Sequence, residues 1–103
     1  MAVEQTIRDA IATRAPVVLT YAGSGDRTVH PHVLYVTSTG KVCAHSYQVD
    51  GYTSSGGPLP EWRPFDLAKI DRAELLDGRF DVAPGLNLSS EMYANGILAH
   101  IEP

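Results

Sequence analysis

Histidine and cysteine side chains recur at a spacing of two residues in two segments that are typical of neighbouring β-strands. His30 and His32 lie two apart, and so do Cys43 and His45. Residues two apart on a strand point to the same face, so pairing of the strands would gather four ligands that suit zinc or nickel. Pro31 favours the other interpretation, a bent edge strand with exposed histidines. We prefer the latter and predict neither a metal site nor a cofactor.

The sequence offers little for catalysis. Cys43 and His45 lack a third group that would orient the base, and cysteine is among the most often buried residues, so we expect Cys43 in the core. Gly23-Ser24-Gly25 is too short for a phosphate-binding loop, and Gly56-Gly57 lacks the Lys-Ser/Thr that would complete one. No pair of carboxylates is placed for acid and base catalysis. We therefore predict no catalytic residue and no enzymatic activity.

Arg27 and Arg63 are the first candidates for binding. The planar guanidinium group of arginine matches phosphate and carboxylate groups, which makes it the preferred residue for an anion site. Lys69 adds a third positive charge in the same part of the chain. The competing interpretation is a surface ion pair with a nearby acid, namely Glu61, Asp66 or Asp26.

Aromatic residues accompany these cations. Trp62 adjoins Arg63, while Tyr47 and Tyr52 flank the start of a long loop. Bases of single-stranded nucleic acid stack on such rings while arginine holds the backbone, so the pattern is typical of a stacking surface. For Trp62 we favour packing in the core or anchoring of a loop, because it is the only tryptophan of a small domain.

Hydrophobic periodicity predicts the elements that would position these residues. Val3, Ile7, Ala10 and Ile11 form one face of a helix over residues 2–14, which Pro16 ends. Runs rich in β-branched residues predict strands over 17–21, 27–37, 41–47 and 62–67, with residues 50–60 as a long loop. Residues 70–76 form a fifth strand or a helical turn, a further turn begins at Ser89 or Ser90, and residues 97–101 add a terminal strand.

This order of elements predicts a mainly β protein. One helix followed by about five short strands favours a small, strongly bent antiparallel sheet or barrel, because parallel strands would need crossover helices that the middle of the chain does not offer. With 103 residues, of which 44 % are apolar, the chain suffices for a single domain over residues 1–103.

Charge and cysteine content exclude several classes of protein. The net charge of −4 arises in residues 73–103, where one arginine faces five acids, so no strongly basic surface for nucleic acid is present overall. No stretch approaches the roughly 20 apolar residues of a membrane span, and the charged first residues differ from a signal peptide. A single cysteine excludes an internal disulfide. We predict a cytoplasmic protein without a membrane partner.

Two motifs add a family resemblance. Arg27-Thr28-Val29-His30-Pro31 and, later, Arg63-Pro64-Phe65-Asp66-Leu67-Ala68-Lys69-Ile70 follow the short helix in the order seen in WYL domains. About residues 5–76 resemble this family, whose members show an Arg-x-Val-x-Pro strand and an Arg-x-Phe-x-Leu-x-Arg-Ile segment. The tripeptide that names the family falls at Val42-Cys43-Ala44, where none of its three residues is kept, and Lys69 replaces the second arginine.

The resemblance implies a small Sm-like or SH3-like β-barrel over residues 17–76, with residues 77–103 as an acidic C-terminal extension. It implies a regulatory sensor, of the kind used in transcriptional regulation, that binds nucleic acid or a small anionic ligand. The ligand-binding positions that it implies are Arg27, His30, Tyr47, Arg63 and Lys69, to which the residues themselves add Trp62. The alternative is a structural or protein-interaction domain, with a protein partner or a second copy as its ligand, in which the binding face has decayed.

Overall fold

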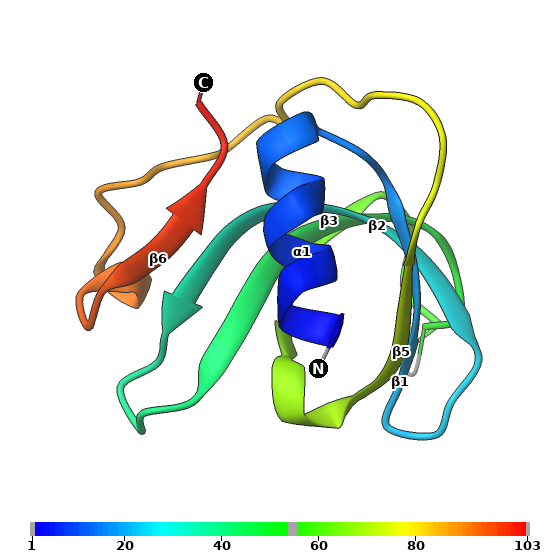
Figure 1. Ribbon diagram of the computed structural model, residues 1–103, viewed down its shortest axis with the longest axis horizontal. Helices are drawn as coiled ribbons and strands as arrows, with labels where there is room; N and C mark the ends of the chain where they lie inside the picture. Colours follow the sequence, from blue (N-terminus) through cyan, green and yellow to red (C-terminus); the bar gives the residue numbers. More distant parts are fainter. Residues whose placement is uncertain (1, 54–55, 103) are drawn as a thin grey trace.

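The computed structural model describes residues 2–53 and 56–102 and is mainly β (Figure 1). One helix, α1 (Ala2–Thr13), precedes five strands, and a sixth strand follows near the end of the chain. The strands are β1 (Val17–Tyr21), β2 (Asp26–Val36), β3 (Val42–Gly51), β4 (Glu61–Asp66), β5 (Ile70–Leu75) and β6 (Ile97–His100). Two short 3-10 helices, η1 (Leu67–Lys69) and η2 (Glu91–Tyr93), complete the list. Residues 70–76 are therefore a strand, and the terminal strand is confirmed.

The strands form one antiparallel sheet in the order β4-β3-β2-β1-β5. The long strand β2 pairs with β3 over most of its length, whereas its other edge is divided between two partners. Val29 lies opposite Val17 of β1, and Leu34 lies opposite Ala99 of β6. The register with β3 shifts beside Pro31, which has no N–H to donate to the ladder. The strand bends there, and the sheet bends with it.

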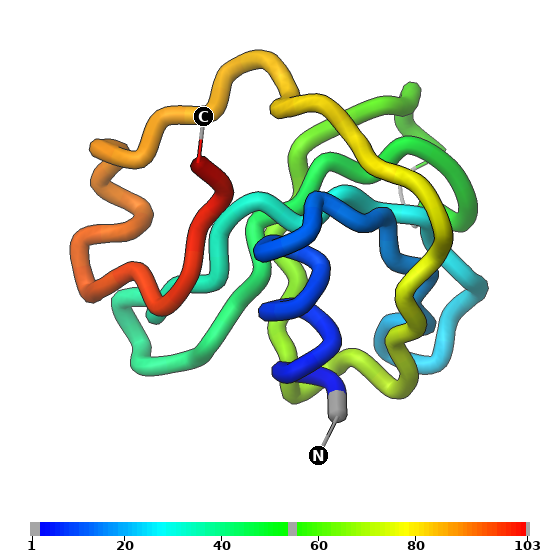
Figure 2. Tube along the Cα trace, turned by 45° about the horizontal axis from the view of Figure 1, so that its top comes forward, coloured from blue at the N-terminus to red at the C-terminus, as the bar shows by residue number. Residues whose placement is uncertain are grey.

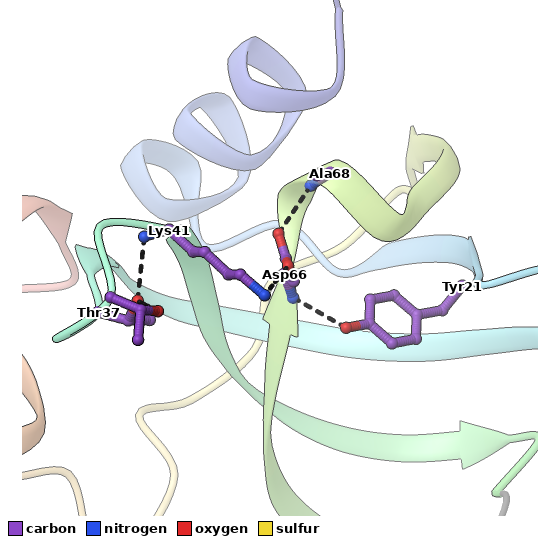
Figure 3. Close-up of polar contacts among 6 residues, drawn as sticks. Tyr21, Thr37, Lys41, Asp66 and Ala68 are labelled. Carbon is purple, nitrogen blue, oxygen red and sulfur yellow. Dashed lines mark hydrogen bonds and ion pairs between the residues drawn. The ribbon is translucent and has the colours of Figure 1, made fainter.

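The bend brings the two ends of the sheet together without closing it. No strand pairing joins β4 to β5 in the part of the chain that the structure describes, so the expected barrel is not confirmed. Figure 3 shows a contact between β4 and β1: the backbone N–H of Asp66 donates to the Tyr21 hydroxyl at 3.0 Å. The Asp66 carboxylate caps η1 by accepting from the Ala68 N–H, and Lys41 lies 3.9 Å from it.

The helix packs on the sheet through the face that its periodicity predicts. Ile7, Ala10 and Ile11 are buried, and they join buried apolar side chains from five strands, β1 to β5, and from the C-terminal segment. The helix ends where the backbone of Arg14 turns left-handed, with φ of 57°, and the Ala15 N–H bonds to the Ala10 carbonyl at 3.0 Å. This is a Schellman motif. Pro16 follows it and prevents the helix from continuing, because it has no backbone N–H to donate.

Residues 76–96, here called the strap, run across the molecule from β5 to β6 (Figure 2). The strap carries several of the acids of the C-terminal segment, yet its Phe80, Ala83 and Tyr93 are buried, and Phe80 belongs to the main core cluster. Ser90 caps η2 by accepting from the Met92 N–H, as the predicted turn requires. No helix among residues 2–53 and 56–102 is long and apolar enough to cross a membrane.

Replacement of Leu34 by alanine tests this packing. Leu34 is fully buried beneath α1, so Leu34→Ala should lower the free energy of unfolding by about 3 kcal/mol, measured by urea denaturation. Leu98 is 41 % exposed on β6, and Leu98→Ala should change the same quantity by no more than about 0.5 kcal/mol. Equal losses in the two variants would contradict the described core.

Candidate functional site

Arg27 lies inside the protein rather than on its surface. Its pairing opposite Leu19 turns its side chain toward the core, where the residue is only 6 % exposed. Three aromatic rings surround the guanidinium carbon at 5.3 to 5.5 Å, those of Tyr21, Tyr52 and Phe65. Such rings attract a cation through their π faces, which partly replaces the lost water.

No carboxylate balances this buried charge among the described residues. Within residues 2–53 and 56–102 the side chain makes one hydrogen bond, a long one of 3.4 Å to the Ser24 hydroxyl, and its Nε has no partner. The neighbouring Asp26 accepts from Thr20 instead. Burial, and then the positive charge of Arg63, lower the pKa of Arg27. The ion-pair interpretation with Asp26 is therefore wrong for Arg27.

Arg63 reaches the same region from β4. It lies opposite the fully buried Ser46, and its side chain is 18 % exposed. One terminal nitrogen stands 2.7 Å from a Glu61 oxygen, which confirms the ion pair that the sequence suggests. The pair does not have the geometry of a hydrogen bond, however, and both Nε and that terminal nitrogen remain without a hydrogen-bond partner.

Gln48 completes a cluster with the two arginines. It is fully buried on β3, and its amide nitrogen donates to the carbonyl oxygens of Tyr52 at 2.8 Å and Asp50 at 3.3 Å. Its amide oxygen accepts nothing. Within residues 2–53 and 56–102, every buried side-chain polar atom without a partner belongs to one of three residues, the arginine cluster of Arg27, Gln48 and Arg63. Unpaired donors beside two positive charges suit an oxyanion.

A second group of side chains gathers on the other face of β3 and β4. His32 and His45 both contact the Trp62 ring, with centroids at 4.9 and 4.7 Å, while His30 stacks on Phe80 of the strap at 4.5 Å. The Trp62 N–H donates to the Pro84 carbonyl at 2.8 Å. Trp62 therefore anchors the strap, as the loop-anchoring interpretation predicts.

Hydrogen bonds identify the proton positions on His32. Its Nδ1 faces the His30 carbonyl at 2.7 Å, and because a carbonyl only accepts, Nδ1 carries the hydrogen. Its Nε2 accepts from the Ala83 N–H of the strap at 3.0 Å. Burial lowers the pKa of His32 to about 4; the positive charges of His30, His45 and Arg14 add to the effect, while the bond to His30 opposes it. Burial also lowers the pKa values of His30 and His45.

These contacts leave the histidines unsuited to the metal that their spacing would allow. The three histidines do gather, but both nitrogens of His32 are used, and His45 Nδ1 lies 2.7 Å from the Tyr93 hydroxyl. The described ranges contain no group of three or more His, Cys, Asp or Glu side chains arranged to hold a metal ion. Cys43 is buried in an apolar cluster with Tyr35, as expected, and burial raises the pKa of its thiol.

The candidate binding residues from the sequence thus divide between two places. Arg27 and Arg63 meet on the core face of the sheet, whereas His30, Tyr47 and Trp62 lie with the histidines, where Tyr47 contacts the Trp62 ring at 5.3 Å. Lys69 is exposed at the end of η1. Sequence reasoning missed Gln48, although its spacing of two from Ser46 and four from Ala44 places it on their face.

A groove of about 310 Å³ lies elsewhere, between the end of β2 and η2. Its lining includes Tyr35, Met92 and Asn95, and no unpaired buried polar atom of the described residues borders it. No family model matches this sequence, and no curated protein matches it either. The function must therefore be inferred from the side chains, and the arginine cluster is the place where their bonding is incomplete.

The histidine contacts predict a loss of stability in acid. The unfolded chain protonates His32 near pH 6.5 and the folded chain only near pH 4, so protons favour the unfolded state between these values. The contribution of His32 to the free energy of unfolding should be fully present above about pH 6.5. It should be lost as the pH falls, which lowers the free energy of unfolding by roughly 2–3 kcal/mol toward pH 4. His32→Gln, which keeps a donor and an acceptor but cannot titrate, should flatten the curve. Urea denaturation at pH 7 and pH 4.5 measures both, and equal values for the unaltered protein would contradict the prediction.

Proposed function

We propose that the protein is a non-enzymatic binding module that holds a small anion between Arg27 and Arg63. The observation that carries the proposal is the incomplete bonding of the arginine cluster. Burying an N–H donor without an acceptor costs about 1–3 kcal/mol, and burying an uncompensated charge costs more. An oxyanion would supply both the acceptors and the missing negative charge.

The burial of the cluster favours a small ligand over nucleic acid. Arg27 is 6 % exposed, so the phosphates of a nucleic-acid strand have no surface on which to meet it. The chain's net charge of −4 also opposes a polyanion. Trp62 and Tyr47, the rings expected to stack on bases, lie on the opposite face with the strap. Of the two ligand classes expected from the sequence, we retain the small anion.

Glu61 and Tyr52 are solvent-exposed residues beside the cluster. Glu61 is the acid beside Arg63, and its side chain is 46 % exposed. Tyr52, whose ring covers the Arg27 guanidinium, is 45 % exposed. An incoming anion would take the place of the Glu61 carboxylate, which acts as a weak internal competitor because it is tethered but poorly aligned.

Membership of the WYL domain family stays a prediction, and so does a regulatory role. In that interpretation the bent sheet would be an Sm-like or SH3-like barrel that lacks the last strand pairing. Of the ligand-binding positions that the WYL resemblance implies, Arg27 and Arg63 would then be the two that bind one ligand together.

Titration with phosphate and with sulfate tests the proposal. In nitrogen-15-labelled protein, the Nε–H signals of Arg27 and Arg63 should shift with at least one of these anions. Arg63→Gln should weaken the binding by about ten- to a hundredfold, because it removes charge-assisted hydrogen bonds. Arg72→Gln on β5, an exposed arginine, serves as the matched control and should bind as the unaltered protein does. Absence of any shift with both anions would overturn the proposal.

A stability measurement separates a binding arginine from a structural one. Arg27→Met keeps apolar contact with the three rings but removes the buried charge, so the free energy of unfolding should stay the same or rise while anion binding is lost. Urea denaturation without added anion measures it. A fall of more than about 2 kcal/mol would instead assign Arg27 a structural role.

Replacement of Glu61 should increase the affinity of the cluster for anions. If its carboxylate competes for Arg63, Glu61→Gln should tighten the binding of phosphate or sulfate by up to about fivefold, since a partly exposed ion pair of about 0.2–1 kcal/mol no longer has to be broken. Glu74→Gln, an exposed acid on β5, controls for the change in net charge alone. Equal gains in both variants would show that only the overall charge matters.

A further inference from the structure

The amide oxygen of Gln48 is the one acceptor among the unpaired atoms of the arginine cluster. The three others, Arg27 Nε and two nitrogens of Arg63, are donors. The orientation of the amide is determined by its surroundings, because the nitrogen donates to two carbonyl oxygens, those of Asp50 and Tyr52. A rotated amide would set oxygen against oxygen twice. The amide oxygen therefore points away from these two carbonyls, is buried, and accepts no hydrogen bond.

The strand register places Gln48 between the two arginines. It lies opposite Glu61 on β4, two residues from the position of Arg63 on the same face, and such diagonal neighbours are about 7–8 Å apart. Toward β2 it lies opposite Val29, two residues from Arg27, with a register shift between Thr28 and Val29. Gln48 and Arg27 also share Tyr52, whose carbonyl bonds to Gln48 and whose ring lies against Arg27.

We propose that the anion bound by this cluster carries a hydrogen donor of its own, which bonds to the Gln48 amide oxygen. The inference rests on the proposed function and names its ligand class: an oxyanion bearing an O–H group, as in hydrogen phosphate or a small hydroxycarboxylate. Its oxygens accept from Arg27 and Arg63, and its hydroxyl donates to Gln48. A plain oxyanion would satisfy the arginines but leave the buried amide oxygen unpaired.

Two matched pairs of probes test the donor. Hydrogen phosphate and sulfate at pH 7.5 have similar shape and charge, but only the first has an O–H group. Glycolate and methoxyacetate differ in the same way, because a methyl group replaces the hydroxyl hydrogen. Titrations followed through the arginine Nε–H signals should give at least about fivefold tighter binding for the hydroxyl member of each pair that binds, which is the effect of one buried hydrogen bond. Whichever pair binds more tightly shows whether the site prefers a phosphate or a carboxylate ligand.

Gln48→Met provides the matching change in the protein. It keeps the length of the side chain without the acceptor, so the preference for hydrogen phosphate over sulfate should fall to about one while sulfate still binds. Because this variant also loses the bonds to the Asp50 and Tyr52 carbonyls, its amide spectrum must first show that it folds. If it does not fold, the comparison of probes on the unaltered protein decides alone.

The outcomes separate this inference from the function on which it rests. Equal affinity within both pairs would overturn the inference that the ligand donates a hydrogen bond to Gln48. The proposed anion site would still hold, with a water molecule as the partner of Gln48. Failure of all four probes to shift the Arg27 and Arg63 signals would overturn both. Tighter binding of the hydroxyl member, lost in Gln48→Met, supports both.

Discussion

The bend of β2 beside Pro31 is the constraint on which the rest of the structure depends. This strand pairs with β3 along one edge. Along its other edge it pairs first with β1 and then with β6. Because it bends, its beginning carries Arg27 into the space between β1 and β4, its middle presents His30 and His32 to the strap, and its end places Leu34 under the helix. One strand thus contributes to the core and to both polar clusters.

The two polar clusters illustrate opposite solutions to the burial of polar groups. Both ring nitrogens of His32 have a partner, and the bond from Ala83 joins β2 to the strap, so that His32 helps to hold this long connection in place. Around Arg27 and Arg63, the donors outnumber the acceptors and the charges repel. Such unpaired buried groups lower the free energy of unfolding, which is already small in a domain of this size. This incomplete bonding is the observation on which the proposed anion site rests.

Strand geometry explains why the expected binding face divides in two. Trp62 and Arg63 are neighbours in the sequence, but neighbours on a strand point to opposite faces. Pairing then carries the division across the sheet: Tyr47 lies opposite Trp62, and Ser46 lies opposite Arg63. The aromatic rings consequently join the histidines, and the arginine is left with Gln48 and Arg27. Adjacency in the chain suggested a joint cation and aromatic surface that the alternation of side chains does not allow.

By itself, the sequence determined the local elements, because periodicity and end signals act within a few residues. It predicts the helix to within one residue of its end at Thr13, the strands except for the last four residues of β3 (Val42–Gly51), the η2 turn and the buried Cys43. Only the tertiary structure decided which strands pair, that the sheet stays open, and that Arg27 and Arg63 meet while Lys69 does not join them. These outcomes depend on the bend of β2 and on contacts such as Tyr21 with Asp66, 45 residues apart, to which no local pattern points.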